Sequence, residues 1–388
     1  MASRGMTATV VGGGIGGIAA ALALRRAGLT VTVLEAKQEL VEAGAGLSLW
    51  PNAVHALGAL GVADEVVARG AVMDSNLIQR WDGKILGRTN LDLERRYGAP
   101  GICVRRADLL AALQAALGSE GVHTGARVVK LQHTRRGAAA VMAGGGRVDA
   151  DFLVGADGLH SVVRNALLGD EPRSLGSIAW RGLAKMRTNG GGLALGRGAH
   201  AGWLPVDGDY TYWFCCRDGD AGRRIGDLRT ELLELFGRWW DPIPTLIQST
   251  PSREILRHHV YDRPPAWSWG TERLTLLGDA AHPMSPAAGQ GACLALEDAV
   301  VLASCITRRP DPAAALRLYE AERMPRAARM QRASLRALRA LQPQSQAAQL
   351  ARDLIMRLPA GLLSAGQSWM FEFPSRRRVR SRKTVLGS

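Results

Sequence analysis

The stretch "TATVVGGGIGGIAAALALRRAGLTVTVLE", residues 7–35, passes from a β-branched apolar run through a glycine turn into an Ala/Leu-rich segment and ends in a second β-branched run. β-branched residues favour strands and Ala/Leu-rich segments favour helices, so this order predicts a βαβ unit. Such units build parallel sheets covered by helices. The chain is therefore predicted to open an α/β domain.

The glycines of this stretch have the spacing of a phosphate-binding turn. Gly12 permits the tight turn, Gly14 lets the backbone approach a pyrophosphate, and Gly17 lets the helix pack closely on the strand. The N-terminus of that helix offers free N–H groups and partial positive charge to the pyrophosphate. Glu35, 18 residues after Gly17, ends the second strand, where a carboxylate accepts hydrogen bonds from an adenosine ribose. The pattern predicts a dinucleotide site and leaves NAD and FAD open.

The rest of the chain alternates between this α/β character and one long β-rich segment. Apolar spacing predicts a helix over 104–117, and seven of the ten tryptophans fall between 173 and 270, among strand-forming runs such as "YTYWFCC". Residues 271–277, "TERLTLL", return to a buried-strand pattern, so we expect the first domain to be discontinuous. We divide the chain into a first domain (1–70, 101–172 and 271–345), a second, β-rich domain (71–100 and 173–270), and a C-terminal helical segment with a basic tail (346–388).

The segment after Pro312 is strongly helical, and Pro325 within it predicts a kink or a restart. Arginines recur along it at three- or four-residue spacing, which we interpret as a solvated helix face. These arginines are Arg323, Arg326, Arg329, Arg332, Arg336 and Arg339.

Two further motifs lie downstream. "GADGLHSVVR" contains Asp157-Gly158 with Arg164 after it, and "GDAAHPMSPAAGQG" contains Gly278-Asp279. With the N-terminal glycines they resemble the three-motif signature of the FAD-dependent aromatic-ring hydroxylases, the single-component flavin monooxygenases similar to p-hydroxybenzoate and salicylate hydroxylases. The resemblance covers most of the chain. It implies an α/β fold with a Rossmann-like FAD-binding domain of the glutathione-reductase type, a β-sheet substrate domain and C-terminal helices.

The resemblance also implies roles for single residues. Asp279 would accept a hydrogen bond from the ribityl chain, Pro286 would lie against the flavin ring, and the helix opened by "GQG" would point backbone N–H groups at the pyrimidine end. For Asp157, a plain turn residue is the alternative to a cofactor contact. The implied cofactor-binding set is Gly12, Gly14, Gly16, Gly17, Glu35, Ala36, Arg106, Val128, Asp157, Asp279, Gly289, Gln290 and Gly291.

On the substrate side, His200 occupies the place where several members that hydroxylate phenols carry a histidine. A histidine with a pKa near neutrality suits removal of a phenol proton, and an ordinary strand histidine is the alternative. Tyr212 across the predicted hairpin, Arg181 and Pro286 are the candidate substrate contacts, with a surface ion pair as the alternative for Arg181. We interpret His282 as a residue that fixes its loop rather than as a catalyst.

The implied activity is hydroxylation of a small aromatic or heteroaromatic molecule. NADH or NADPH would reduce FAD, and dioxygen would then form a flavin C4a-hydroperoxide that transfers its distal oxygen. No second GxGxxG is present for the reductant, which is normal for this family. Epoxidation, oxidation of a non-aromatic natural product and double-bond reduction remain open on the same fold. A halogenase is disfavoured because "WSWG" at 267–270 does not reproduce the expected tryptophan motif.

Composition sets further limits. The net charge of +14 comes from 44 Arg and five Lys, with six basic residues in "RRRVRSRK" at 376–383, so a basic nucleic-acid- or membrane-associated flavoprotein without turnover is the alternative from another class. The five cysteines have no disulfide or metal spacing, which favours a reducing cytoplasm. The apolar run "IGGIAAALAL" is too short to span a membrane, and we interpret it as a buried helix. We expect no nucleic-acid partner and no stable membrane insertion, and leave monomer or homodimer open.

Overall fold

The computed structural model describes residues 5–40, 46–134, 137–219, 226–358 and 366–374. The basic run at 376–383 therefore lies outside the described residues. The N-terminal glycine motif belongs to a parallel sheet in which Val10 pairs with both Val33 and Val154. In sheet order, the five strands are β18 (Leu274–Leu276), β12 (Phe152–Gly155), β1 (Thr7–Val11), β2 (Thr30–Leu34) and β8 (Val122–His123).

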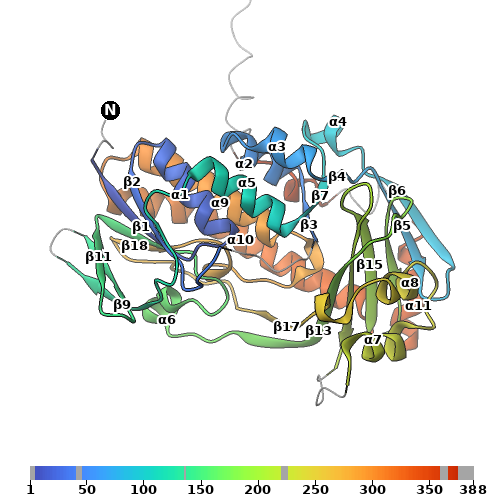
Figure 1. The fold of residues 1–388 in the computed structure, drawn as a ribbon. Coiled ribbons are helices and arrows are strands. Elements are labelled where there is room, and N and C mark those ends of the chain that lie inside the picture. The colour runs from blue at the N-terminus through green and yellow to red at the C-terminus, as the bar shows by residue number, and fades with distance from the viewer. Residues whose placement is uncertain (1–4, 41–45, 135–136, 220–225, 359–365, 375–388) are drawn as a thin grey trace, which may run out of the picture.

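Long helices cover this sheet, as Figure 1 shows. The predicted buried helix is α1, in which eight of the ten residues from Ile15 to Leu24 are apolar and buried, and it packs against α5 and α9. α10 and α2 pack on α9 in turn. No helix in the described ranges combines the length and apolarity needed to cross a membrane. The bounds are α1 (Ile15–Arg26), α2 (Pro51–Ala59), α3 (Ala63–Ala68), α4 (Leu93–Tyr97), α5 (Arg106–Leu117), α6 (Val162–Leu168), α9 (Gly291–Arg308) and α10 (Pro312–Leu341).

Two small antiparallel sheets flank this layer. Three strands between residues 128 and 150 form one of them, beside α6 in Figure 1. The other sheet takes its edge strand β4 from the start of the segment that we had placed in the second domain. The strands are β11 (Arg147–Ala150), β10 (Ala138–Met142) and β9 (Val128–His133) in the first, and β3 (Gly46–Leu49), β7 (Ile102–Arg105) and β4 (Ala71–Val72) in the second.

A seven-stranded sheet stands at the opposite end of the molecule from α6 (Figure 1). It is antiparallel except where β14 pairs with β5 in parallel. Its strands, in order, are β17 (Leu256–Asp262), β13 (Arg173–Ala184), β16 (Thr211–Asp218), β15 (Ala199–Pro205), β14 (Gly191–Leu195), β5 (Ser75–Arg80) and β6 (Ile85–Asn90), with α7 (Leu228–Phe236), α8 (Ile243–Gln248) and α11 (Gln346–Ile355) beside it.

The two faces of this sheet have different neighbours. Trp180 and Trp213 are fully buried on the face that packs against α7 and α8, so these tryptophans form a core. Successive side chains of a strand point to opposite faces. Tyr212 accordingly lies on the other face, in a cluster with Cys103 and Trp50 of the helix-covered part of the chain.

α10 excludes one of the two outcomes expected at Pro325 and differs from the expectation for its arginines. It runs without a break from Pro312 to Leu341, so Pro325 does not restart it. The solvated arginine face was also wrong for Arg323, which is fully buried, and for Arg326, which is largely buried. The reason is that α10 packs along α9, whose acidic residues face it. The remaining arginines of the series are exposed: Arg329, Arg332, Arg336 and Arg339.

A buried charge network joins α9, α10 and the loop after β18. Arg323 donates to Asp298 at 2.6 Å and to Glu297 at 2.7 Å, and all three side chains are fully buried. His282 Nε2 lies 2.6 Å from the second oxygen of Asp298. Burial alone would raise the pKa of Asp298, but the charges of His282 and Arg323 and their hydrogen bonds lower it to about 2. The network therefore keeps two carboxylates ionised in the core.

Removal of Arg323 would take a buried cation away from both carboxylates and leave Glu297 with Arg326 and Asp298 with His282. We expect Arg323→Leu to lower the free energy of unfolding by about 3–5 kcal/mol, measured by urea denaturation at neutral pH. Arg332→Leu, an exposed position on the same helix, is the matched control and should change it by less than about 0.5 kcal/mol. Equal small losses in the two variants would show that the network contributes little.

Candidate FAD-binding cleft

A cleft of about 400 Å³ opens at the carboxyl ends of four parallel strands. The residues that follow β1, β2, β12 and β18 line it: Gly12, Glu35, Asp157 and Asp279. Ligands of open α/β sheets bind outside this edge. Four of the predicted residues, far apart in the chain, are thus brought to one cleft. The other predicted residues that line it are Gly14, Gly16, Ala36, Arg106, Val128 and Gly291.

The glycine turn has the geometry that its spacing predicts. Gly12 has φ +107°, and a Cβ there would lie 2.4 Å from the Ala156 carbonyl oxygen. Gly14 begins α1 in an ordinary extended conformation (φ −72°) and faces the cleft. Gly17 lies outside the cleft lining, because it packs so closely on the turn that a Cβ would meet the Gly12 oxygen at 1.9 Å. Gly17 therefore serves packing, and Gly14 leaves room for a ligand.

Two helix N-termini converge on the cleft with their first N–H groups uncapped. Neither α1 nor α9 has a side-chain cap or an acidic residue in its first turn. Gly291, Ala292 and Ala295 of α9 line the cleft, and such small side chains let a ligand approach the backbone. Partial positive charge at both helix ends favours an anionic ligand between them.

Gly289 and Gln290 are not among the cleft-lining residues. Gln290 is buried, and its Oε1 accepts a hydrogen bond from Asn52 at 3.0 Å, while Asn52 also donates to Glu297 at 2.7 Å. Gly289 has φ +61° and ends the short 3₁₀ helix Pro286–Ala288. These two residues position the start of α9, and their predicted direct contact with the cofactor stays a prediction.

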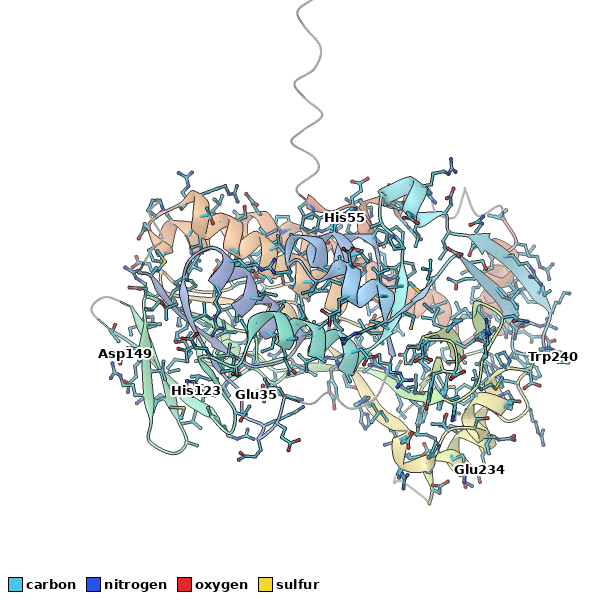
Figure 2. All side chains as sticks on the ribbon, turned by 45° about the horizontal axis from the view of Figure 1, so that its top comes forward. Glu35, His55, His123, Asp149, Glu234 and Trp240 are labelled. Carbon is cyan, nitrogen blue, oxygen red and sulfur yellow. The ribbon has the colours of Figure 1, made fainter. Side chains whose placement is uncertain are left out.

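Glu35 is already engaged by the glycine turn. Its carboxylate accepts hydrogen bonds from the backbone N–H of Gly13 at 2.6 Å and of Lys37 at 2.8 Å. Figure 2 shows Glu35 close to His123, whose carbonyl accepts from the Glu35 N–H at 2.8 Å. The carboxylate is therefore held at the mouth of the cleft with a fixed orientation.

Asp157 lies at the cleft and also holds the start of α6, while its predicted contact with the cofactor stays a prediction. It lines the cleft, and its carboxylate also accepts from Ser161 and from the backbone N–H of Val162 at 2.7 Å, at the start of α6. Arg164 links this motif to the next one, because its guanidinium donates to the carbonyls of Ala280 at 3.0 Å and Ala281 at 2.7 Å. The second and third motifs are thereby tied together.

The adjacent residues Arg105 and Arg106 have different surroundings. Arg106 lines the cleft, whereas Arg105 pairs with Asp207 at 2.7 Å and stacks on Tyr210. Sequence reasoning missed three other polar residues that line the cleft: Lys37, Arg127 and His160. Each is within two residues of a residue or motif that had been singled out, but only the fold shows that they line the same cleft.

His282 acts as a structural residue. Its ring is 1% exposed and makes the contact with Asp298 described above, while Asp298 also accepts from the Gly278 N–H at 3.1 Å. The loop that carries Asp279 is thereby anchored to α9. The prediction that His282 fixes its loop agrees with this geometry.

His200 is 3% exposed on β15 and lies outside the cleft lining. Burial, with a smaller contribution from the charge of Arg352, lowers its pKa from 6.5 to about 4. The expected pKa near neutrality was therefore wrong for this histidine, since the surrounding strands and Phe214 exclude water from its ring. His200 is neutral at physiological pH.

Three candidate substrate residues lie outside the cleft lining. Tyr212 is opposite Leu204 across the β15–β16 hairpin, while His200 is opposite Cys216, so the two share a sheet face without being direct partners. Arg181 of β13 is opposite Phe214 of β16 and is half-buried on the same sheet face as Tyr212 and His200. Pro286 begins the 3₁₀ helix just before α9.

The residues of the cleft fit a flavin dinucleotide. A glycine cradle that a side chain would fill, two uncapped helix ends for the pyrophosphate and reduced ring, and a carboxylate at the end of β2 meet in one space.

Comparisons with known proteins agree with this fit. A family model described as an FAD binding domain matches residues 6–334. The chain is 39% identical over 330 residues to the aurachin C monooxygenase/isomerase of Stigmatella aurantiaca, covering 83% of this chain and 86% of that protein. It is 35% identical over 347 residues to the 3-amino-4-hydroxybenzoate 2-monooxygenase of Streptomyces cremeus, covering 87% and 88%. The solved structure of Klebsiella pneumoniae HpxO complexed with FAD and uric acid matches with a TM-score of 0.90 at 29% identity, covering 96% of this chain and 99% of that chain.

Gly14 gives a direct test of the cleft, because its backbone conformation is open to other residues and its side-chain position faces the ligand space. We expect Gly14→Val to fold but to lose bound FAD on purification, measured by the visible flavin absorbance per mole of protein. Gly144→Val, at a position where a Cβ meets nothing within 4 Å, is the control and should keep its flavin. Full flavin content in Gly14→Val would place the cofactor elsewhere.

Proposed function

Because the chain belongs to the FAD-dependent aromatic-ring hydroxylase family, and is therefore an FAD-dependent monooxygenase, we propose that it hydroxylates a small aromatic or heteroaromatic molecule with NADH or NADPH and dioxygen as co-substrates. The observation that carries the proposal is the convergence of two uncapped helix N-termini on the four strand ends of the cleft. Bound FAD would supply the redox and oxygen chemistry there.

The chain's own residues would position and stabilise the cofactor. Gly12 and Gly14 let the α1 backbone approach the pyrophosphate, and Glu35 is oriented for the ribose. Asp279 is exposed to the cleft within the anchored loop and is our candidate for the ribityl chain. The N-terminus of α9 would stabilise the negative charge of the reduced ring.

We propose that the face of the seven-stranded sheet that carries Tyr212, Arg181 and His200 binds the substrate, with Pro286 between that face and the cofactor. We also propose that the chain divides into domains at the boundaries expected from the sequence. Arg181 makes no ion pair or hydrogen bond with the residues that the structure describes, which leaves its guanidinium available to an anionic group on the substrate.

The reductant and the cellular setting belong to the same proposal. NAD(P)H would dock transiently, since the sequence contains no second glycine motif for it. All five cysteines are free and buried, which suits a reducing cytoplasm.

The reaction class is tested with labelled dioxygen. We expect substrate-dependent NAD(P)H oxidation, screened over phenols, aromatic acids, N-heterocycles and polycyclic metabolites, to give a product that carries one labelled oxygen atom by mass spectrometry. Product without label would indicate a reductase on the same fold. A colourless protein that binds DNA in a salt-sensitive way would instead support the nucleic-acid alternative.

The role of His200 is tested by the pH dependence of turnover. A base acts only when neutral, and the pKa of about 4 means that His200 loses this form only as the pH falls through about 4. We therefore expect the acid limb of kcat/KM for a phenolic substrate to lie near pH 4. His200→Asn should remove that limb and slow hydroxylation roughly 100-fold while flavin reduction keeps its rate.

His259→Asn, an exposed histidine on β17, is the matched control for this experiment and should leave both rates unchanged. If His200→Asn slowed flavin reduction and hydroxylation equally, the loss would be structural and His200 would not be the base.

A further inference from the structure

α11 is amphipathic, but its charged residues face the protein and its apolar residues face solvent, which is the reverse of an ordinary surface helix. Its charged pair points inward: Arg352 and Asp353 are 5% exposed, pair with each other at 2.8 Å, and Arg352 also donates to the Gly196 carbonyl at 2.7 Å. Its large apolar residues point outward at i, i+4 and i+8 spacing. They are Leu350 (54% exposed), Leu354 (64%), Ile355 (50%) and, one turn beyond, Leu358 (48%).

Neighbouring segments extend this apolar surface. The α11 end lies against β6, since a Cβ on Gly87 would sit 2.9 Å from the Met356 oxygen. Trp81, in the turn before β6, and Ile85, the first residue of β6, are exposed. The Trp240 N–H donates to the Trp81 carbonyl at 2.7 Å. Figure 2 shows Trp240 at the outer edge of the molecule. We call the seven residues Leu350, Leu354, Ile355, Leu358, Trp81, Ile85 and Trp240 the α11 patch.

The segments that carry Trp81, Ile85 and the leucines of the α11 patch have an excess of positive charge. Segments 80–90 and 336–358 contain seven basic residues and two acidic ones, and each acidic residue is paired with a neighbouring arginine of its own segment. Five exposed cations are left that form no ion pair with any residue described in the structure: Lys84, Arg88, Arg336, Arg339 and Arg357.

We propose that the α11 patch docks this protein on an anionic lipid surface. Exposed leucines on a helix lying in the membrane plane, tryptophans at its edge and cations on the same segments are the features that interfacial binding requires. A second copy of the chain fits less well, because an isologous contact would bring two sets of five unpaired cations together. The proposal does not depend on the substrate or on the reductant.

The test uses full-length protein with FAD bound and flotation with two kinds of vesicle, pure phosphatidylcholine and an equal mixture of phosphatidylcholine and phosphatidylglycerol. We expect binding to the anionic vesicles that weakens as salt rises. Leu350→Gln/Leu354→Gln should lower the bound fraction at least about tenfold. Leu168→Gln, which changes an exposed leucine of α6 at the other end of the molecule, is the matched control and should bind as the unsubstituted protein does.

Flavin content and the thermal midpoint would show that the variants fold. If the double variant does not fold, Leu354→Gln alone replaces it in the vesicle-binding test. Three results would overturn the proposal. They are no binding to anionic vesicles, unchanged binding by the Leu→Gln variants, or loss of binding only when residues 375–388 are deleted. Self-association that the double variant abolishes, without vesicle binding, would instead make the α11 patch an interface between copies.

Discussion

The pairing of Arg323 with Glu297 and Asp298 is the interaction on which the architecture of the site depends. Buried carboxylates are costly unless cations and hydrogen bonds compensate them. Arg323 binds both carboxylates, and Arg326 is a second cation for Glu297. Asp298 also binds His282 and the Gly278 N–H, so the same network holds the loop of the third motif. The loop that carries Asp279 and the helix that faces it thus share one anchor beneath the cleft.

The cleft also depends on which helix N-termini have no side-chain cap. α6 is capped by Ser161 and Asp157, whereas the first N–H groups of α1 and α9 have no side-chain cap and face the cleft. A helix end left without a cap costs stability unless a ligand or water satisfies it. The N-termini of α1 and α9 are therefore open to an anionic ligand in the cleft, whereas that of α6 is satisfied by its own side chains. Arg164, buried between the second and third motifs, ties the segments that follow β12 and β18 to each other at the cleft.

The substrate side follows a different physical rule. Its sheet buries tryptophans against α7 and α8, and turns Tyr212, Arg181 and His200 toward the cofactor-binding part of the chain. The burial of His200 on this face also lowers its pKa to about 4, so its imidazole is a weak base. The sequence could identify His200 and its neighbours along the strand. Its pKa depends on the residues packed around it in three dimensions, which the sequence does not give.

The sequence by itself determined the βαβ opening, the glycine turn, the three motifs and the family, because local spacing and residue type define a phosphate-binding turn and strand ends. It also located ten of the thirteen implied cofactor residues that the fold brings to one cleft. Only the tertiary structure decided which polar groups are paired. Arg323 belongs to a series of arginines whose spacing along α10 predicts a solvent-exposed face, yet it is buried because α9 places two carboxylates opposite it. The leucines of α11 have core-like spacing, yet they are exposed because Arg352 and Asp353 occupy the inner face. Helical periodicity defines a stripe of residues, and the partners packed against the helix decide which side of it faces water.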